Sequence, residues 1–300
     1  MSEVAIVTEL LGKKFGSHWA VKSLNLKISQ GSVYGLLGRN GAGKSTTMDL
    51  LSGVLKATEG SAVILGHNLA RERGRIVNEI AYINQAKTLY GHLTVDRMVQ
   101  LARGLSRNWS EALAAKYIKL PGKSRISSLS KGQAVQLAFG LAAARRARVL
   151  LIDEPTANLD PIAVQRVLRG LIEDCVAEGA TVLIASHQLD EIAQVCDRAG
   201  LLEDGHLLHE VAVDDIDAMY RVITAVQESA DVTGPGIIKS RRVNGTARYL
   251  VCGSVPEITG RLTSGGAKIL DVRPATLRTL YMELLDDAEE TSGLQQEMHS

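Results

Sequence analysis

A short segment near the N-terminus has the residue types of a loop that binds phosphate. Glycine stands at its first and sixth positions, and lysine and serine follow the second of these glycines. Such glycines let backbone N–H groups surround a phosphate, the lysine reaches the β- and γ-phosphate oxygens, and the serine hydroxyl is a ligand for Mg²⁺. The segment therefore predicts a site for a nucleoside triphosphate and Mg²⁺. Its residues are Gly38, Arg39, Asn40, Gly41, Ala42, Gly43, Lys44 and Ser45.

Two adjacent acids, Asp153 and Glu154, follow an apolar run at 149–152. The end of a buried strand is a costly place for two carboxylates unless each has a function. Asp153 suits a contact to Mg²⁺ through a water molecule or another ligand, and Glu154 is placed to polarise an attacking water. Taken alone, the two acids could cap a helix. With a phosphate-binding loop upstream, the catalytic interpretation is favoured.

A third segment opens a predicted helix that extends to about residue 146. Its residues are Leu129, Ser130, Lys131, Gly132 and Gln133. Ser130 and Gln133 have the spacing of a capping box, so this segment alone indicates an ordinary helix start. The same geometry also suits an anion, because free N–H groups and the helix dipole meet at a helix N-terminus.

The elements that must position these residues alternate between apolar strands and amphipathic helices, which is typical of an α/β fold with a largely parallel sheet. Helices are predicted at 44–55, at 93–103 and from Asn108, whose side chain would form a capping box with Glu111. The predicted strands are 4–11, 20–28, 32–37, 81–84, 149–153 and 181–186.

The pattern changes after about residue 215. Strands are predicted at 221–226 and 248–252, and helices at 256–262 and 275–285. We therefore predict two domains. Residues 1–215 would carry the nucleotide chemistry, with a helical subdomain at about 86–146. Residues 216–300 would form a small accessory α/β domain that supports dimer contacts.

Charge and hydropathy limit the possible partners. The chain has 34 basic and 33 acidic residues, a net charge of +1, which gives no bulk attraction to nucleic acid. Short basic runs at 71–75 and 145–148 are interpreted as solvated helix ends. The longest apolar run, at about 134–144, is shorter than the ~20 residues that a membrane span needs. We therefore expect a soluble protein whose membrane role depends on a partner.

The order of the three motifs resembles the nucleotide-binding domain of the ABC ATPase family over about residues 4–215. The resemblance implies a P-loop NTPase core with a mixed sheet, flanking helices and an inserted helical subdomain. It also implies ATP and Mg²⁺ as ligands, with a nucleotide segment that extends to Thr46. The segment from Leu129 to Gln133 resembles the family signature, which contacts the γ-phosphate bound by the other subunit of a head-to-tail dimer.

Further site residues follow from this resemblance alone. Gln85 matches the glutamine that contacts Mg²⁺ and the attacking water, and His187 matches a histidine that reaches the γ-phosphate. Asp160 lies in a segment that resembles the D-loop. Phe15 stands where the family places an aromatic ring against adenine, and Trp19 is a weaker candidate. Lys131 departs from the commonest signature, which has glycine there.

The resemblance implies an ATP hydrolase that powers a separate transmembrane permease from the cytoplasmic face of the membrane, most simply as a homodimer. A nucleic-acid-linked ABC ATPase is disfavoured, because the chain has one phosphate-binding loop and no long coiled coil. The compact helical insert and the segment 271–277 resemble ATPases of drug, peptide or lipid exporters. An importer subunit remains the alternative. We predict the permease contact at about 86–100.

Overall fold

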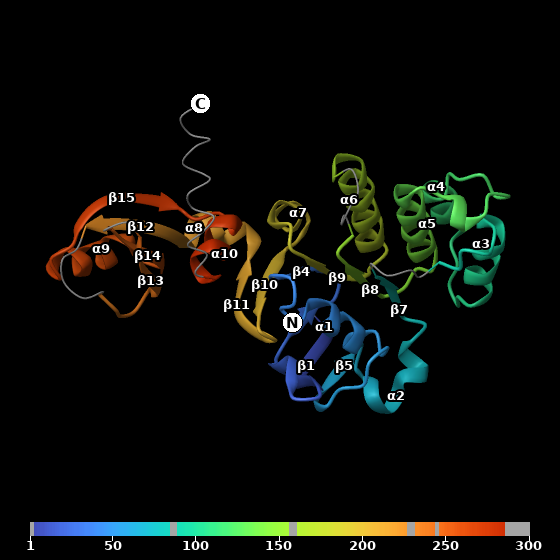
Figure 1. Cartoon of the computed structure of the whole chain (residues 1–300), viewed down its shortest axis with the longest axis horizontal. Helices are drawn as coiled ribbons and strands as arrows, with labels where there is room; N and C mark the ends of the chain where they lie inside the picture. Colours follow the sequence, from blue (N-terminus) through green and yellow to red (C-terminus); the bar gives the residue numbers. More distant parts are fainter. Residues whose placement is uncertain (1–2, 85–88, 156–160, 227–231, 244–245, 286–300) are drawn as a thin grey trace. The chain divides into compact units, whose positions relative to one another are not determined.

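The computed structural model describes residues 3–84, 89–155, 161–226, 232–243 and 246–285 (Figure 1). The chain separates into two compact units, Met1–Glu210 and Val211–Ser300. The predicted boundary lay five residues later, after residue 215 (215 − 210 = 5). Strand β11, His206–Ala212, spans the division, and a short 3₁₀ helix, Val213–Asp215, follows it.

A six-stranded sheet forms the centre of the first unit, in the order β11-β10-β4-β9-β8-β7. Each pair of neighbouring strands from β10 to β7 in this order is parallel. Parallel strands are covered on both faces, which explains why every residue of β4, β8 and β9 is buried. Besides β11, the strands are β4 (Val33–Leu37), β7 (Ile80–Ile83), β8 (Val149–Asp153), β9 (Thr181–Ser186) and β10 (Arg198–Glu203).

An antiparallel sheet makes up the rest of the β structure in this unit, and a shared apolar core joins it to the central sheet. One predicted strand, 20–28, is in fact two strands. Ser23 has φ of 50°, and the Asn25 side chain accepts a hydrogen bond from the Leu10 N–H at 2.8 Å, so the chain leaves the ladder between them. The strands are β1 (Val4–Phe15), β2 (His18–Leu24), β3 (Lys27–Ser29), β5 (Glu59–Ile64) and β6 (His67–Asn68).

The helices that were predicted for this unit begin near their expected positions, with two corrections, and the helices at 69–76 and 189–195 were not predicted. The first helix stops at Leu51 instead of residue 55, because Gly53 adopts φ of 74° and turns the chain. The predicted cap Asn108 is wrong, since Ser110 accepts from the Leu113 N–H at the start of that helix. The helices are α1 (Lys44–Leu51), α2 (Leu69–Ile76), α3 (Val95–Gly104), α4 (Glu111–Tyr117), α5 (Lys131–Ala144), α6 (Pro161–Ala177), α7 (Leu189–Val195) and a 3₁₀ turn (Ile126–Ser128).

Helices α3, α4 and α5 form the helical subdomain. Its small core joins Val95 and Met98 of α3 to Leu137 and Leu141 of α5, with Ile126 between them. The capping box at the start of α5 is confirmed, because the Ser130 hydroxyl accepts from the Gln133 N–H and the Gln133 side chain accepts from the Ser130 N–H.

The second unit is an antiparallel four-stranded sheet in the order β13-β14-β12-β15, with α9 packed on it. The strands at the positions of β13 and β15 were not predicted. Glu283 of α10 is 3% exposed and pairs with Arg241 at 2.8 Å and Arg248 at 2.6 Å. The elements are α8 (Ile216–Met219), β12 (Tyr220–Val226), β13 (Ile237–Val243), β14 (Thr246–Cys252), α9 (Val255–Ser264), β15 (Lys268–Pro274) and α10 (Leu277–Leu285).

Candidate nucleotide site

The phosphate-binding loop joins the end of β4, at Leu37, to the start of α1, at Lys44. Gly43 precedes the helix with φ of 103°, a conformation that disfavours any side chain. A Cβ atom at this position would lie 2.2 Å from the Ala20 carbonyl oxygen of β2. The backbone of β2 therefore packs directly against the loop, and only glycine fits.

Lys44 is buried, with 5% of its surface exposed. Its ammonium group donates to the carbonyl oxygens of Gly38 at 2.8 Å and Arg39 at 3.2 Å. It also lies 3.2 Å from Oε1 of Glu154. The loop backbone thus holds the cation in place at the start of α1, where the helix dipole adds positive potential.

Asp153 ends β8 and is 5% exposed. Burial raises the pKa of this carboxyl group, and a hydrogen bond from Ser45 opposes the shift. Its Oδ1 atom is buried without a hydrogen-bond partner. A hydroxyl and an unsatisfied carboxylate oxygen are the oxygen donors that Mg²⁺ prefers.

Glu154 follows directly and adopts φ of 48°, which is uncommon for a residue with a side chain. Its N–H donates to the Ala185 carbonyl of β9, which fixes the turn at the end of β8. Its Oε2 atom lies 2.6 Å from Nδ1 of His187. One carboxylate therefore contacts both His187 and Lys44.

These side chains meet because β8 and β9 are parallel neighbours whose carboxyl ends reach the same edge of the sheet. A cleft of about 510 Å³ opens there. It is lined by Ala20, Asn40, Gly41, Gly43, Lys44, Ser45, Thr46, Glu154, His187 and Gln188. Its polar lining and buried cation suit a phosphate group at a helix N-terminus.

Known proteins resemble the chain over this unit. A family model described as ABC transporter matches residues 21–157. The Bacillus licheniformis protein described as Bacitracin transport ATP-binding protein BcrA is 32% identical over 222 residues, 72% of each chain. The chain belongs to the ABC transporter ATP-binding family. It is therefore an ATP-binding subunit of the ABC type, a family of ATP hydrolases, and the predicted P-loop fold is confirmed.

Three further similar proteins match about the same share of this chain. The Escherichia coli protein described as Probable multidrug ABC transporter ATP-binding protein YbhF is 34% identical over 72% of this chain but only 38% of that protein. A structure described as ATP binding subunit of ABC transporter superimposes with TM-score 0.63 at 26% identity, covering 71% of this chain and 92% of that one. A structure described as Dimeric Structure of MJ0796, a Bacterial ABC Transporter Cassette gives 0.61 at 26% identity, covering 69% and 98%.

The signature segment of this ABC subunit does not line the cleft. Ser130 caps α5, Gly132 has space for a Cβ atom with nothing within 4 Å, and Lys131 is exposed. The segment lies at the start of α5 in the helical subdomain. Its predicted contact with nucleotide on a second subunit stays a prediction.

The adenine contact is also a prediction. Phe15 ends β1, is 49% exposed and lies under the Lys13 ammonium at 5.2 Å from the ring centroid. Trp19 lies in β2, with the Lys14 ammonium at 5.4 Å. Neither ring is among the residues that line the cleft, although Ala20 of the same hairpin is.

Gln85 and Asp160, predicted from the family resemblance, lie outside the described residues. In the described part of the chain, no group of three or more His, Cys, Asp or Glu side chains could hold a metal ion by itself. Ala20 and Gln188 line the cleft without having been predicted, because neither belongs to a sequence motif.

Proposed function

We propose that this chain hydrolyses Mg-ATP in the cleft at the carboxyl ends of β8 and β9. The observation that carries the proposal is that Lys44, Glu154 and His187 line one cleft with the phosphate-binding loop, and that Asp153 accepts a hydrogen bond from Ser45 of that loop. Lys44 would neutralise the γ-phosphate, His187 would contact it, and Glu154 would accept the proton of the attacking water.

Ser45 and Asp153 would hold Mg²⁺, together with Gln85. The unsatisfied Oδ1 atom of Asp153 and the adjacent Ser45 hydroxyl support this assignment. The ion would supply charge neutralisation to the β- and γ-phosphates. Lys44 must give up its contact with Glu154 for the γ-phosphate, which would leave that carboxylate free to orient water.

We further propose a head-to-tail homodimer in which the signature of each subunit closes over the nucleotide of the other. Ser130, Gly132 and the free N–H groups of α5 have the composition of an anion site. The similar cassette described as a dimeric structure supports a dimer. Asp160 would contribute to the same interface.

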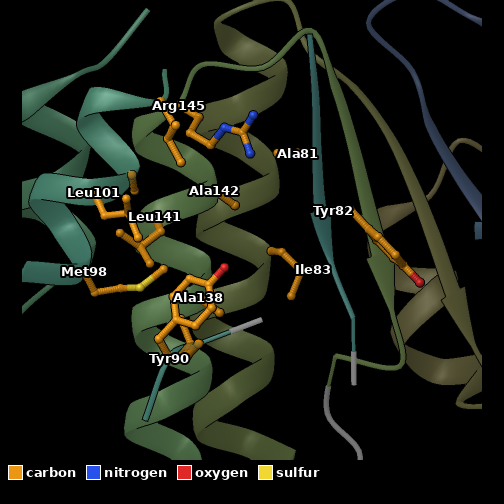
Figure 2. Close-up of a pocket in the computed structure, with 13 residues that line it drawn as sticks. Ala81, Tyr82, Ile83, Tyr90, Met98, Leu101, Ala138, Leu141, Ala142 and Arg145 are labelled. Atoms are coloured by element: carbon orange, nitrogen blue, oxygen red, sulfur yellow. The ribbon is translucent and has the colours of Figure 1, made fainter. Parts of the chain in front are cut away.

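A transmembrane permease is the second proposed partner. Figure 2 shows a groove between β7 and helices α3 and α5, into which Met98, Leu101 and Leu141 point. Tyr90 and Leu105 also line it and are 55% and 67% exposed. Exposed apolar side chains around a groove are typical of a protein interaction site. Residues that line the groove lie on both sides of Gln85 in the sequence, so a change at Gln85 on nucleotide binding would reach the groove.

The proposed direction of transport is export of a drug, peptide or lipid. Relatives described with the words multidrug and Linearmycin resistance support this, because resistance through a transporter is most simply explained by export. No described helix is long and apolar enough to cross a membrane. The proposed permease partner also implies a location: the chain would lie on the cytoplasmic face of the membrane and be held there by its permease.

The ATP site is tested with Lys44→Ala. Loss of the Lys44 ammonium, which the loop carbonyls of Gly38 and Arg39 hold in place, should abolish Mg-ATP binding, measured by equilibrium titration of the purified chain. Lys22→Ala, which removes an exposed lysine outside the cleft lining, serves as the control. Wild-type affinity in Lys44→Ala would show that the loop is misassigned.

The proposed permease is tested by purification of the tagged chain from native membranes. A permease should be recovered with it, and the identity of that permease decides between export and import.

A further inference from the structure

A second cavity, of about 570 Å³, opens between the end of α1, the start of α2 and the antiparallel sheet. Its walls are apolar, since buried Leu11, Leu50 and Leu69 line it. Its size falls in the range of pockets that hold small ligands. None of its described lining residues also lines the ATP cleft, so the two sites are distinct.

Three cations stand at this cavity: Lys56, Arg71 and Arg73. All three are exposed, and their side chains have no ion pair with any residue that the structure describes. The described lining contains no carboxylate. Arg75 of the same helix differs, because it pairs with Glu72 at 3.0 Å. Two arginines of the basic run at 71–75 thus line an apolar cavity.

The mouth of the cavity also carries an exposed apolar side chain. Val54, in the loop after α1, is 63% exposed and lines the cavity. Basic residues beside an exposed apolar group are typical of surfaces that bind an anionic lipid interface. An acidic protein segment would match the cations but would leave the apolar walls and Val54 without a counterpart.

We propose that this cavity binds an anionic phospholipid of the membrane, with Lys56, Arg71 and Arg73 contacting the phosphate headgroup and the leucine walls accepting an apolar portion. The proposal rests on the proposed function, because a subunit that serves a permease works at the membrane surface. After α2 ends at Ile76, the chain enters β7 at Ile80, and β7 lines the groove assigned to the permease. The helix that carries Arg71 and Arg73 is therefore followed directly in the sequence by a strand that lines the groove proposed for the permease.

The test is sedimentation of the full chain with vesicles of phosphatidylcholine alone or mixed with phosphatidylglycerol. The wild-type chain should bind the mixed vesicles more tightly. The triple variant Lys56→Gln/Arg71→Gln/Arg73→Gln should lose about 100-fold, since each cation near an anionic surface contributes roughly fivefold. High salt screens the attraction between the cations and the headgroups but not apolar contacts. Val54→Ser should therefore weaken the vesicle binding that remains at high salt. The matched control, Arg107→Gln/Lys119→Gln/Lys123→Gln, removes three other exposed cations and should keep most of the binding.

Two results would overturn the proposal: equal binding of the wild-type chain to both kinds of vesicle, or equal losses in the two triple variants. Equal binding to both kinds of vesicle together with saturable binding of inorganic phosphate would indicate a site for a soluble phosphate compound. Mg-ATP affinity is measured for every variant in parallel. Lost vesicle binding with intact ATP binding supports the lipid site. If the wild-type chain does not bind Mg-ATP, that result counts against the proposed function and not against the lipid site.

Discussion

The Glu154 carboxylate occupies a position that the γ-phosphate should compete for. It lies 3.2 Å from the Lys44 ammonium and 2.6 Å from Nδ1 of His187, and it is 10% exposed. A carboxylate in a confined site attracts a cation strongly. Arrival of ATP would therefore exchange one anionic partner of Lys44 for another and release Glu154 toward the attacking water.

The variant Glu154→Gln separates binding from hydrolysis. An amide keeps the shape but cannot accept the proton of water, so single-turnover hydrolysis should slow by about 10² or more. Mg-ATP affinity should be kept or increased, because the amide no longer competes for Lys44. Size-exclusion chromatography should show a dimer with Mg-ATP and less dimer with Mg-ADP, which lacks the γ-phosphate.

Glu178→Gln is the control, since it removes a half-exposed surface carboxylate paired with Arg146 and should leave the hydrolysis rate unchanged. Hydrolysis by Glu154→Gln at the wild-type rate would remove Glu154 from the mechanism. An inactive variant that stays monomeric in Mg-ATP would keep the general base but count against a dimer formed without the permease.

At the scale of elements, two helices of the helical subdomain begin in the same way but have different proposed roles. Ser130 caps α5 and Ser110 caps α4, each by accepting a backbone N–H at 3.2 Å. Both hydroxyls satisfy donors that a helix start would otherwise leave unpaired. Only Ser130 belongs to the signature, so replacing Ser110 is a matched control for replacing Ser130.

Replacing either serine with alanine should lower the free energy of unfolding by about 1 kcal/mol, the usual cost of a lost cap. Ser130→Ala should in addition reduce the steady-state ATPase rate and the ATP-dependent dimer, because the hydroxyl would contact the γ-phosphate across the interface. Denaturant titration gives the first quantity, and ATPase assays with chromatography give the second. Equal ATPase rates in the two variants would assign Ser130 a purely structural role.

At the scale of the whole molecule, each unit has its own core. The core of the first unit joins Leu36 and Leu151 of the central sheet to Met48 and Leu51 of α1. The core of the second unit joins Ile223 and Tyr249 of its sheet to Ile258 and Leu262 of α9. A separate core in each unit indicates that each can fold independently.

A chain that ends at Asp215 should therefore fold and bind Mg-ATP with unchanged affinity. It keeps β11, and every described residue that lines the ATP cleft lies in the first unit. Circular dichroism checks folding, and equilibrium titration checks binding. If the second unit supports dimer contacts, Glu154→Gln in this shorter chain should form less dimer with Mg-ATP. A folded truncation that fails to bind ATP would contradict this division of labour.

Local patterns were sufficient for β4, β7, β8 and β9 of the central sheet, whereas β5, β6, β10 and β11 were not predicted. The predicted strands 149–153 and 181–186 have those bounds in the structure, because strands buried on both faces are apolar along most of their length and leave polar residues such as Asp153 and Ser186 to their ends. The capping box at Ser130 was likewise predictable from spacing. The strand β13 was not, since Ile237–Val243 carries Lys239, Arg241 and Arg242, and the burial of Arg241 against Glu283 of a distant helix is a tertiary effect.

The sequence alone determined the chemistry of the candidate site: a cation and a hydroxyl after a glycine-rich turn, and two acids after a buried strand. These assignments depend on residue types a few positions apart, which local backbone geometry controls. Only the tertiary structure decided that Glu154 contacts both Lys44 and His187, and that Arg71 and Arg73 line a cavity. Such contacts depend on strand order and on the packing of helices distant in sequence, which no local pattern encodes.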